Sequence, residues 1–231
     1  MAPHGRRAVL SLTTRFCLPH EGMATLDYLS SGSAVVLRGT TSSSLAVVTC
    51  QHYFTATWDW LQFVNEDHVR HSLQLLAVDE SNSRPDVLLE LPLAPQVHTH
   101  ESRDLALLTL VDSAALESWQ QAEQELGVQT LTLQQAPCER GDAASSQATD
   151  NYSSGQEFAW SQELLEEGMC GGAVVGAATD QCVGIVEGIV PTIMRQALAG
   201  HVAFIPASDV RKFIEEPDDL LLTGMELPPR M

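Results

Sequence analysis

Lysine, cysteine pairs and long apolar runs are all scarce in this sequence of 231 residues, and each shortage excludes a class of protein. Lys212 is the only lysine, and 12 basic residues stand against 30 acidic ones, which gives a formal net charge of −18. Such a negative field repels phosphate backbones, so we expect no direct binding of nucleic acid. No apolar stretch approaches the roughly 18–20 residues that cross a bilayer, so we expect no membrane span.

The cysteines and paired histidines give no sign of a metal site. The cysteine count is odd, the spacing is irregular and no Cys-x-x-Cys pair occurs, so we expect no metal, no cofactor and a reduced, intracellular compartment. His68 and His71 lie three residues apart in EDHVRHS and are interpreted as surface residues. The five cysteines are Cys17, Cys50, Cys138, Cys170 and Cys182.

The first twenty residues differ from the rest in charge. They contain Arg6, Arg7 and Arg15 and no acid before Glu21, which is typical of an organelle transit peptide and makes the mitochondrion the candidate location. The same segment contains AVLSLTTRF, which is rich in β-forming residues and equally predicts a first strand. Residues 1–20 are therefore a basic N-terminal segment with two open interpretations.

Short runs rich in Val, Leu and Thr recur between turn residues, which is typical of an all-β barrel or sandwich. A polar, helix-permissive stretch at 113–127 is interpreted as a linker between an N-terminal unit, 21–112, and a C-terminal unit, 128–216. Ser208 is predicted to cap a helix after the last strand, and 217–231 is interpreted as a tail. The predicted strands cover 33–39, 44–54, 72–80, 87–93, 104–112, 128–136, 171–178, 182–190 and 201–206.

Three short segments carry side chains that can do chemistry. An apolar strand runs into His52 in AVVTCQHYF, Asp104 opens the apolar run DLALLTL, and Cys170 lies among glycines in EEGMCGGAVV. Each has an ordinary alternative: an incidental histidine, a turn residue at a strand end, and a buried structural cysteine. The glycines around Cys170 allow a sharp turn and a close approach of the backbone to a substrate. The amides of Gly168 and Cys170 could then form an oxyanion hole.

Taken together, the three segments resemble the trypsin-like peptidase family. The residues follow the order His52, Asp104, Cys170, with intervals of 52 and 66 residues, and Cys170 occupies the position of the usual serine. The motif Gly-Met-Cys-Gly-Gly is similar to that of picornaviral chymotrypsin-like cysteine proteases, and the similarity covers roughly residues 30–216. The resemblance implies an all-β fold of two antiparallel six-stranded β-barrels, chymotrypsin-like, with a C-terminal helix.

The resemblance also implies a substrate-binding region. Leu164 falls near the position that carries an acid in members that cut after Arg or Lys, which argues against a basic residue before the scissile bond. The strand that contains Ile185, Val186 and Glu187 is expected to pair with the substrate. His201 is expected either near the floor of the pocket, where it would favour a polar or acidic residue, or as a simple strand cap.

Two functions follow from the resemblance. The first is an endopeptidase that uses Cys170, His52 and Asp104 to cleave a protein or peptide substrate through an acyl-enzyme. The alternative is a catalytically silent pseudoprotease that acts as a subunit or assembly factor of a large organellar complex, such as the mitochondrial ribosome.

Overall fold

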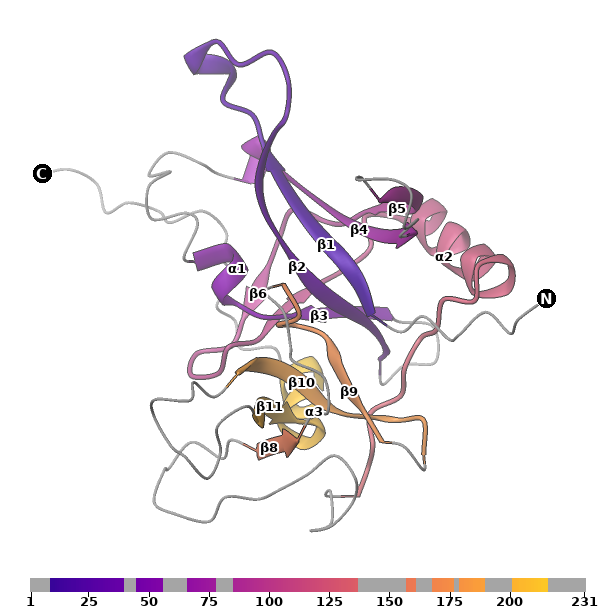
Figure 1. Cartoon of the computed structure of the whole chain (residues 1–231). Coiled ribbons are helices and arrows are strands. Elements are labelled where there is room, and N and C mark those ends of the chain that lie inside the picture. The colour runs from indigo at the N-terminus through magenta and orange to yellow at the C-terminus, as the bar shows by residue number, and fades with distance from the viewer. Residues whose placement is uncertain are drawn as a thin grey trace, which may run out of the picture.

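The structure, a computed structural model, describes residues 9–39, 45–55, 66–77, 85–136, 157–160, 168–176, 179–189 and 201–215. Within these ranges the chain forms two antiparallel sheets with few helices (Figure 1). The seven-stranded sheet has the order β5 (Asp86–Pro92), β4 (Val69–Ala77), β1 (Val9–Phe16), β2 (Asp27–Arg38), β3 (Leu45–Thr49), β7 (Ala106–Leu108) and β6 (His98–Thr99). The four-stranded sheet has the order β8 (Glu157–Trp160), β11 (His201–Pro206), β10 (Cys182–Ile189) and β9 (Ala173–Val175).

The mostly β class is confirmed, but the expectation of two closed six-stranded barrels is wrong. The described strands form open sheets of seven and four strands. An isolated bridge joins Leu93, just beyond β5, to Leu110, just beyond β7, but no described strand pair closes the larger sheet there. The expected strand at 128–136 forms only isolated bridges, through Leu131 to β2 and through Leu133 to β10, within the described residues.

The apolar runs of the sequence reflect burial on both faces of the larger sheet. Because side chains alternate along a strand, Ala34 and Val36 of β2 pack into one core cluster while Val35 and Leu37 pack into another. The second cluster joins the two sheets and reaches the last helix, and its other members include Val48, Leu105, Ile185, Ile205 and Phe213. A strand buried on both faces reads as a continuous apolar run rather than an alternating one.

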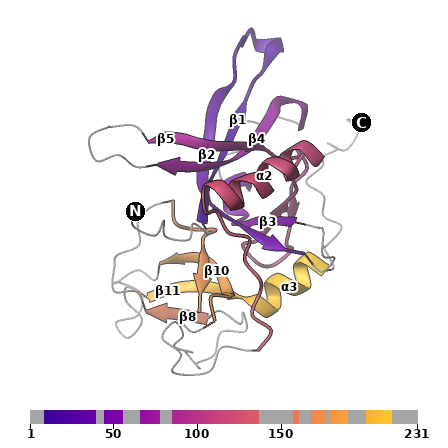
Figure 2. The same ribbon diagram turned by 90° about the vertical axis from the view of Figure 1, so that its right-hand side faces the viewer.

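The described helices are α1 (His52–Thr55), α2 (Ser113–Glu125), α3 (Ala207–Glu215) and the 3-10 turns η1 (Pro19–Glu21) and η2 (Glu66–His68). Helix α2 lies against the larger sheet and α3 against the smaller one (Figure 2). The carboxylate of Asp112 caps α2 by accepting the Ala115 N–H at 2.8 Å. Helix α3 follows β11 directly and begins at Ala207, so Ser208 lies inside the helix and the predicted cap is wrong. Within the described part of the chain, no helix combines the length and the apolarity needed to span a bilayer.

Strand β1 lies inside the larger sheet, where it pairs with β2 on one side and β4 on the other. The strand interpretation of the N-terminal segment is therefore confirmed for Val9–Phe16, and residues 1–8 lie outside the described residues.

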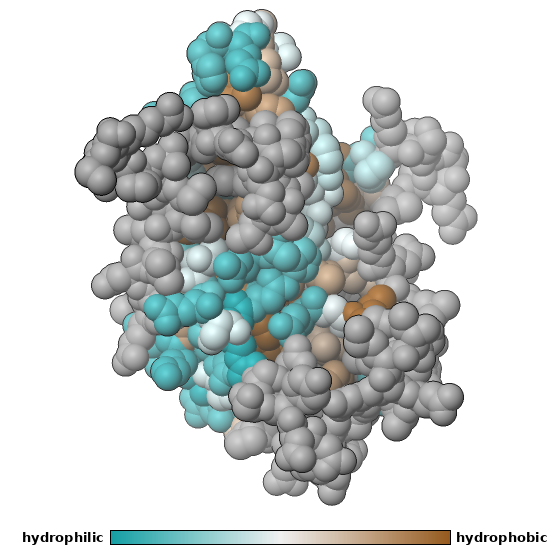
Figure 3. All heavy atoms as spheres, turned by 90° about the vertical axis from the view of Figure 1, so that its left-hand side faces the viewer, coloured by the Kyte–Doolittle hydropathy of each residue, from teal (hydrophilic) through white to brown (hydrophobic). Residues whose placement is uncertain are grey.

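On the face shown in Figure 3, hydrophilic side chains form a band across the middle, with hydrophobic side chains visible beside it.

His71 is buried in the larger sheet, so its interpretation as a surface residue is wrong. Its side chain lies in β4, is 2% exposed and contacts the edge of the Phe54 ring. Its Nδ1 atom lies 3.0 Å from the hydroxyl of Thr14 on the neighbouring strand. Burial lowers the pKa of His71 to about 4, because a charged imidazole loses its hydration there.

Candidate active site

The register of two neighbouring strands brings His52 and Asp104 together. Thr49, the last residue of β3, pairs with Ala106, the first residue of β7, so the segments after β3 and before β7 lie side by side. The backbone N–H of His52 donates to one carboxylate oxygen of Asp104 at 2.8 Å. The Nδ1 atom of His52 lies 2.6 Å from the other oxygen. The carboxylate thus fixes both the backbone and the ring of His52.

The charges of this pair reinforce each other. A side-chain hydrogen bond to Asp104, followed by the influence of the neighbouring Cys170 side chain, raises the pKa of His52 to about 10 against the opposing effect of burial. Burial raises the pKa of Asp104, but the hydrogen bonds and the charge of His52 outweigh it, so the pKa is lowered overall. An imidazolium beside a carboxylate is therefore the favoured state near neutral pH.

Cys170 lies on a turn that has glycine at two positions with left-handed backbone conformation. Gly168 and Gly171 adopt φ angles of 94° and 81°, in the left-handed region where other residues are strained. A Cβ on Gly171 would lie 2.2 Å from the carbonyl oxygen of Ser33 on β2. The Gly171 N–H donates to the carbonyl of Val186 at 2.8 Å, which attaches the turn to β10. The turn therefore contacts β2 of the larger sheet and β10 of the smaller sheet.

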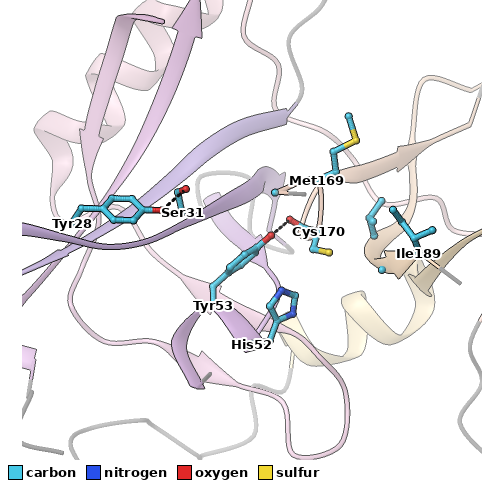
Figure 4. A pocket seen from close by; sticks show the side chains of 10 residues that line it. Tyr28, Ser31, His52, Tyr53, Met169, Cys170 and Ile189 are labelled. Carbon is cyan, nitrogen blue, oxygen red and sulfur yellow. Dashed lines mark hydrogen bonds between the residues drawn. The ribbon is translucent and has the colours of Figure 1, made fainter. Parts of the chain in front are cut away.

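The three predicted side chains converge beside a cavity of about 690 Å³. His52 and Cys170 both line it, and in Figure 4 the imidazole and the sulfur point toward one another. The Cys170 side chain is close enough to the imidazole to contribute to the raised pKa of His52. Asp104 lies behind the ring, on the side of Nδ1. This arrangement can transfer a proton between a thiol and an imidazole whose orientation is fixed by a carboxylate.

The other expected site residues have mixed positions. Gly168 and Val186 line the cavity, whereas Ile185, Glu187 and His201 are not among its lining residues. The side chain of Ile185 is fully buried in the cluster that joins the sheets, so this residue could meet a substrate only through its backbone. The Nδ1 atom of His201 is buried and has no hydrogen-bond partner among the described residues. Leu164 lies outside the described residues.

Several lining residues were missed by reasoning from the sequence. These are Tyr28 and Ser31 of β2 and Tyr53 of α1. Gly188 and Ile189 of β10 also line the cavity, on the strand where substrate contacts were expected. Tyr53 directly follows His52, and that adjacency was the one available signal. The residues on β2 gave none, because a contact between β2 and the Cys170 turn depends on the tertiary fold.

Cys50 adds a buried thiol behind the site. Its sulfur donates to the carbonyl of Val186 at 3.2 Å, and burial followed by the charge of Asp104 raises its pKa. Cys50, His52 and Asp104 place ligand atoms within 4.8 Å of one another, and among the described residues they are the group that could hold a metal ion. These atoms already bond to each other or to Val186, so proton transfer is the chemistry that the geometry favours.

Comparisons with known proteins add a distant structural likeness. No family model matches the chain, and no curated protein matches it. A solved structure described as a catalytically active tobacco etch virus protease complexed with product is similar to it with a TM-score of 0.48. The two share 13% sequence identity over 96% of this chain and 82% of that chain. The chain is thus a mostly β protein with a cysteine, histidine and aspartate cluster, and the chemistry of its site follows from its own geometry.

Proposed function

We propose that this protein is a cysteine endopeptidase that cleaves peptide bonds through an acyl-enzyme on Cys170. The observation that carries the proposal is the position of the His52 imidazole, between the Asp104 carboxylate and the Cys170 thiol at the wall of an open cavity. A histidine whose pKa is raised to about 10 carries a positive charge near neutral pH, and a neighbouring imidazolium in general favours the thiolate form of a cysteine. The thiolate is the nucleophilic form of cysteine.

The proposed reaction has two halves. The Cys170 thiolate attacks the scissile carbonyl carbon, and the amides of Gly168 and Cys170 stabilise the negative oxygen. His52 then gives its proton to the departing amine, the C–N bond breaks, and a thioester remains. In the second half a water molecule loses a proton to His52 and attacks the thioester. The C–S bond breaks, the acid product leaves, and the thiolate–imidazolium pair is restored.

The exposed edge of β10 is the proposed place for the substrate backbone. Strand β9 pairs with β10 as far as Ile185, and the turn at Gly171 and Gly172 bonds to Val186. Gly188 and Ile189 follow on the same strand and line the cavity. A peptide lying along this edge would pass the Cys170 sulfur within the cavity.

Site-specific alkylation tests the proposal directly. The purified chain is treated with iodoacetamide at pH 7, and modification of the Cys170 peptide is followed by mass spectrometry in the wild type, His52→Ala and Asp104→Asn. A free thiol is only a few per cent thiolate at neutral pH, so loss of the imidazolium is expected to slow alkylation about twentyfold. Cys17, which is partly exposed, supplies the internal control because neither substitution touches it.

Turnover on a peptide library completes the test. Cleavage that disappears in Cys170→Ala supports the endopeptidase. Equal alkylation of wild type and His52→Ala, together with no turnover, would reject it in favour of the silent scaffold.

A further inference from the structure

Tyr53 contacts both partners of the proposed reaction. It follows His52 in α1, and the centroids of the two rings lie 4.4 Å apart. Its hydroxyl donates to the backbone carbonyl of Cys170 at 3.0 Å (Figure 4). The ring thus connects the end of β3, where the imidazole is held, with the turn that carries the thiol.

Strand β2 leaves room for this ring. A Cβ on Gly32 would lie 2.1 Å from the Cζ atom of Tyr53, well inside any real contact. The φ angle of Gly32 is not positive, so its backbone conformation does not require glycine. Glycine is needed here because a side chain would overlap the Tyr53 ring. Any larger residue at position 32 would displace the Tyr53 hydroxyl from the Cys170 carbonyl.

Ser33, the next residue on β2, holds the same turn. Its N–H donates to the Cys170 carbonyl at 3.2 Å, and its hydroxyl donates to the Gly168 carbonyl at 2.7 Å. The Ser33 carbonyl accepts the hydroxyl of Thr49 at 2.7 Å. The Cys170 carbonyl therefore receives two hydrogen bonds from the larger sheet, one from a backbone amide and one from the phenol.

The Tyr53 hydroxyl is suited to donate over a wide pH range. Burial, and then the charge of Cys170 and Cys50, raise its pKa. The phenol therefore keeps its proton where the thiolate is formed, and it cannot compete with His52 as a base. Its role is to hold the carbonyl in place rather than to exchange protons.

We propose that Tyr53 is a positioning residue for the Cys170 nucleophile. By holding the Cys170 carbonyl, the phenol fixes the peptide between Cys170 and Gly171, and with it the position of the Cα atom from which the sulfur projects. The inference rests on the proposed function, because a nucleophile has to exist for its orientation to matter. The same contacts predict that glycine at position 32 is needed for the reactivity of the Cys170 thiol, because any side chain there would displace the Tyr53 ring.

The test compares Tyr53→Phe with wild type in the full-length chain. The rate of Cys170 alkylation is measured between pH 6 and pH 9, together with the thermal midpoint. Losing one neutral hydrogen bond is expected to slow alkylation about fivefold to tenfold across this range. Gly32→Ala is expected to reproduce the loss by displacing the ring. Thr130→Val is the matched control, since its hydroxyl bonds Trp119 under α2 and its removal should lower stability without slowing alkylation.

The outcomes separate this inference from the proposed function. If His52→Ala slows alkylation while Tyr53→Phe and Gly32→Ala both react like wild type, the positioning role is overturned and the peptidase proposal stands. If Tyr53→Phe lowers only the thermal midpoint, as Thr130→Val does, the residue is structural and the inference is also overturned. If His52→Ala itself reacts like wild type, the proposed function fails first.

Discussion

His52 at the start of α1 and His71 in β4 have pKa values that their surroundings shift in opposite directions. His52 hydrogen-bonds a carboxylate, which raises its pKa to about 10, whereas burial lowers the pKa of His71 to about 4. The stability contributed by the His52 ion pair is present below pH 6.5 and is lost as pH rises through about 10. The contribution of His71 has the opposite sign, because its folded state resists protonation.

His71 therefore makes the fold sensitive to acid. Between pH 6.5 and pH 4 the unfolded chain binds a proton at this residue that the folded chain does not, so stability falls as pH falls. A shift of that size corresponds to roughly 3 kcal/mol at the acid end of the window. Unfolding in urea, measured from pH 7 to pH 4, should show a shallower loss of stability in His71→Phe than in wild type. Parallel curves for the two proteins would contradict the assignment.

At the scale of elements, the turn at residues 168–171 depends on contact as much as on backbone conformation. Gly22 and Gly171 have nearly equal φ angles of 83° and 81°, but a Cβ on Gly22 meets nothing within 4 Å. Gly22→Ala is expected to cost about 1 kcal/mol of backbone strain and to leave Cys170 alkylation unchanged. Gly171→Ala adds a clash with the Ser33 carbonyl and should slow alkylation at least tenfold, since the turn has to withdraw from β2.

These two predictions are checked by measuring the free energy of unfolding and the rate of Cys170 alkylation for Gly22→Ala and Gly171→Ala. Equal effects of Gly22→Ala and Gly171→Ala on alkylation would show that the clash has no consequence for the thiol. A slow rate confined to Gly171→Ala would assign the effect to the contact with β2.

The elements that could be predicted from the sequence are those whose signal is local. The apolar run before His52, the aspartate before β7 and the glycines around Cys170 are each visible within ten residues. That the sheets stay open was not predictable from the sequence. Whether residues 128–136 pair as a full strand depends on strand edges that distant segments supply. The contact between Tyr53 of α1 and Gly32 of β2 depends on the shape of one side chain and the absence of another. A pattern of hydrophobic spacing in the sequence carries no information about such a contact.

At the scale of the whole molecule, one shared core cluster sets the positions of the two sheets and hence of the reacting groups. Val35 of β2 and Ile185 of β10 belong to that cluster, while Ser33 and Val186, close by on the same strands, hold the Cys170 turn. His52 opens α1 just after β3 of the larger sheet, and Cys170 lies in the segment leading into the smaller sheet. Substitutions that loosen the shared core are therefore expected to separate thiol from imidazole before they unfold either sheet.

The charge of the whole chain leads to a prediction about substrates. The cavity has exposed apolar walls at Tyr28, Met169 and Ile189, whereas the protein as a whole carries a formal charge of −18. A peptide with apolar residues at the scissile bond and lysines at its ends should therefore be cleaved with a higher kcat/KM than the same peptide with glutamates at its ends. At low ionic strength the preference is expected to be about tenfold, because a field of one sign concentrates the opposite charge.

Salt separates this long-range effect from a specific pocket. The Debye length falls from about 10 Å at 0.1 M to about 3 Å at 1 M, so the preference for the lysine-flanked peptide should shrink toward unity at high salt. A third peptide with glutamine ends serves as the neutral reference, and its kcat/KM should change little between the two conditions. A lysine preference that survives 1 M salt would instead require a local acidic pocket beside the cavity, and a preference for the glutamate ends would contradict the electrostatic argument altogether.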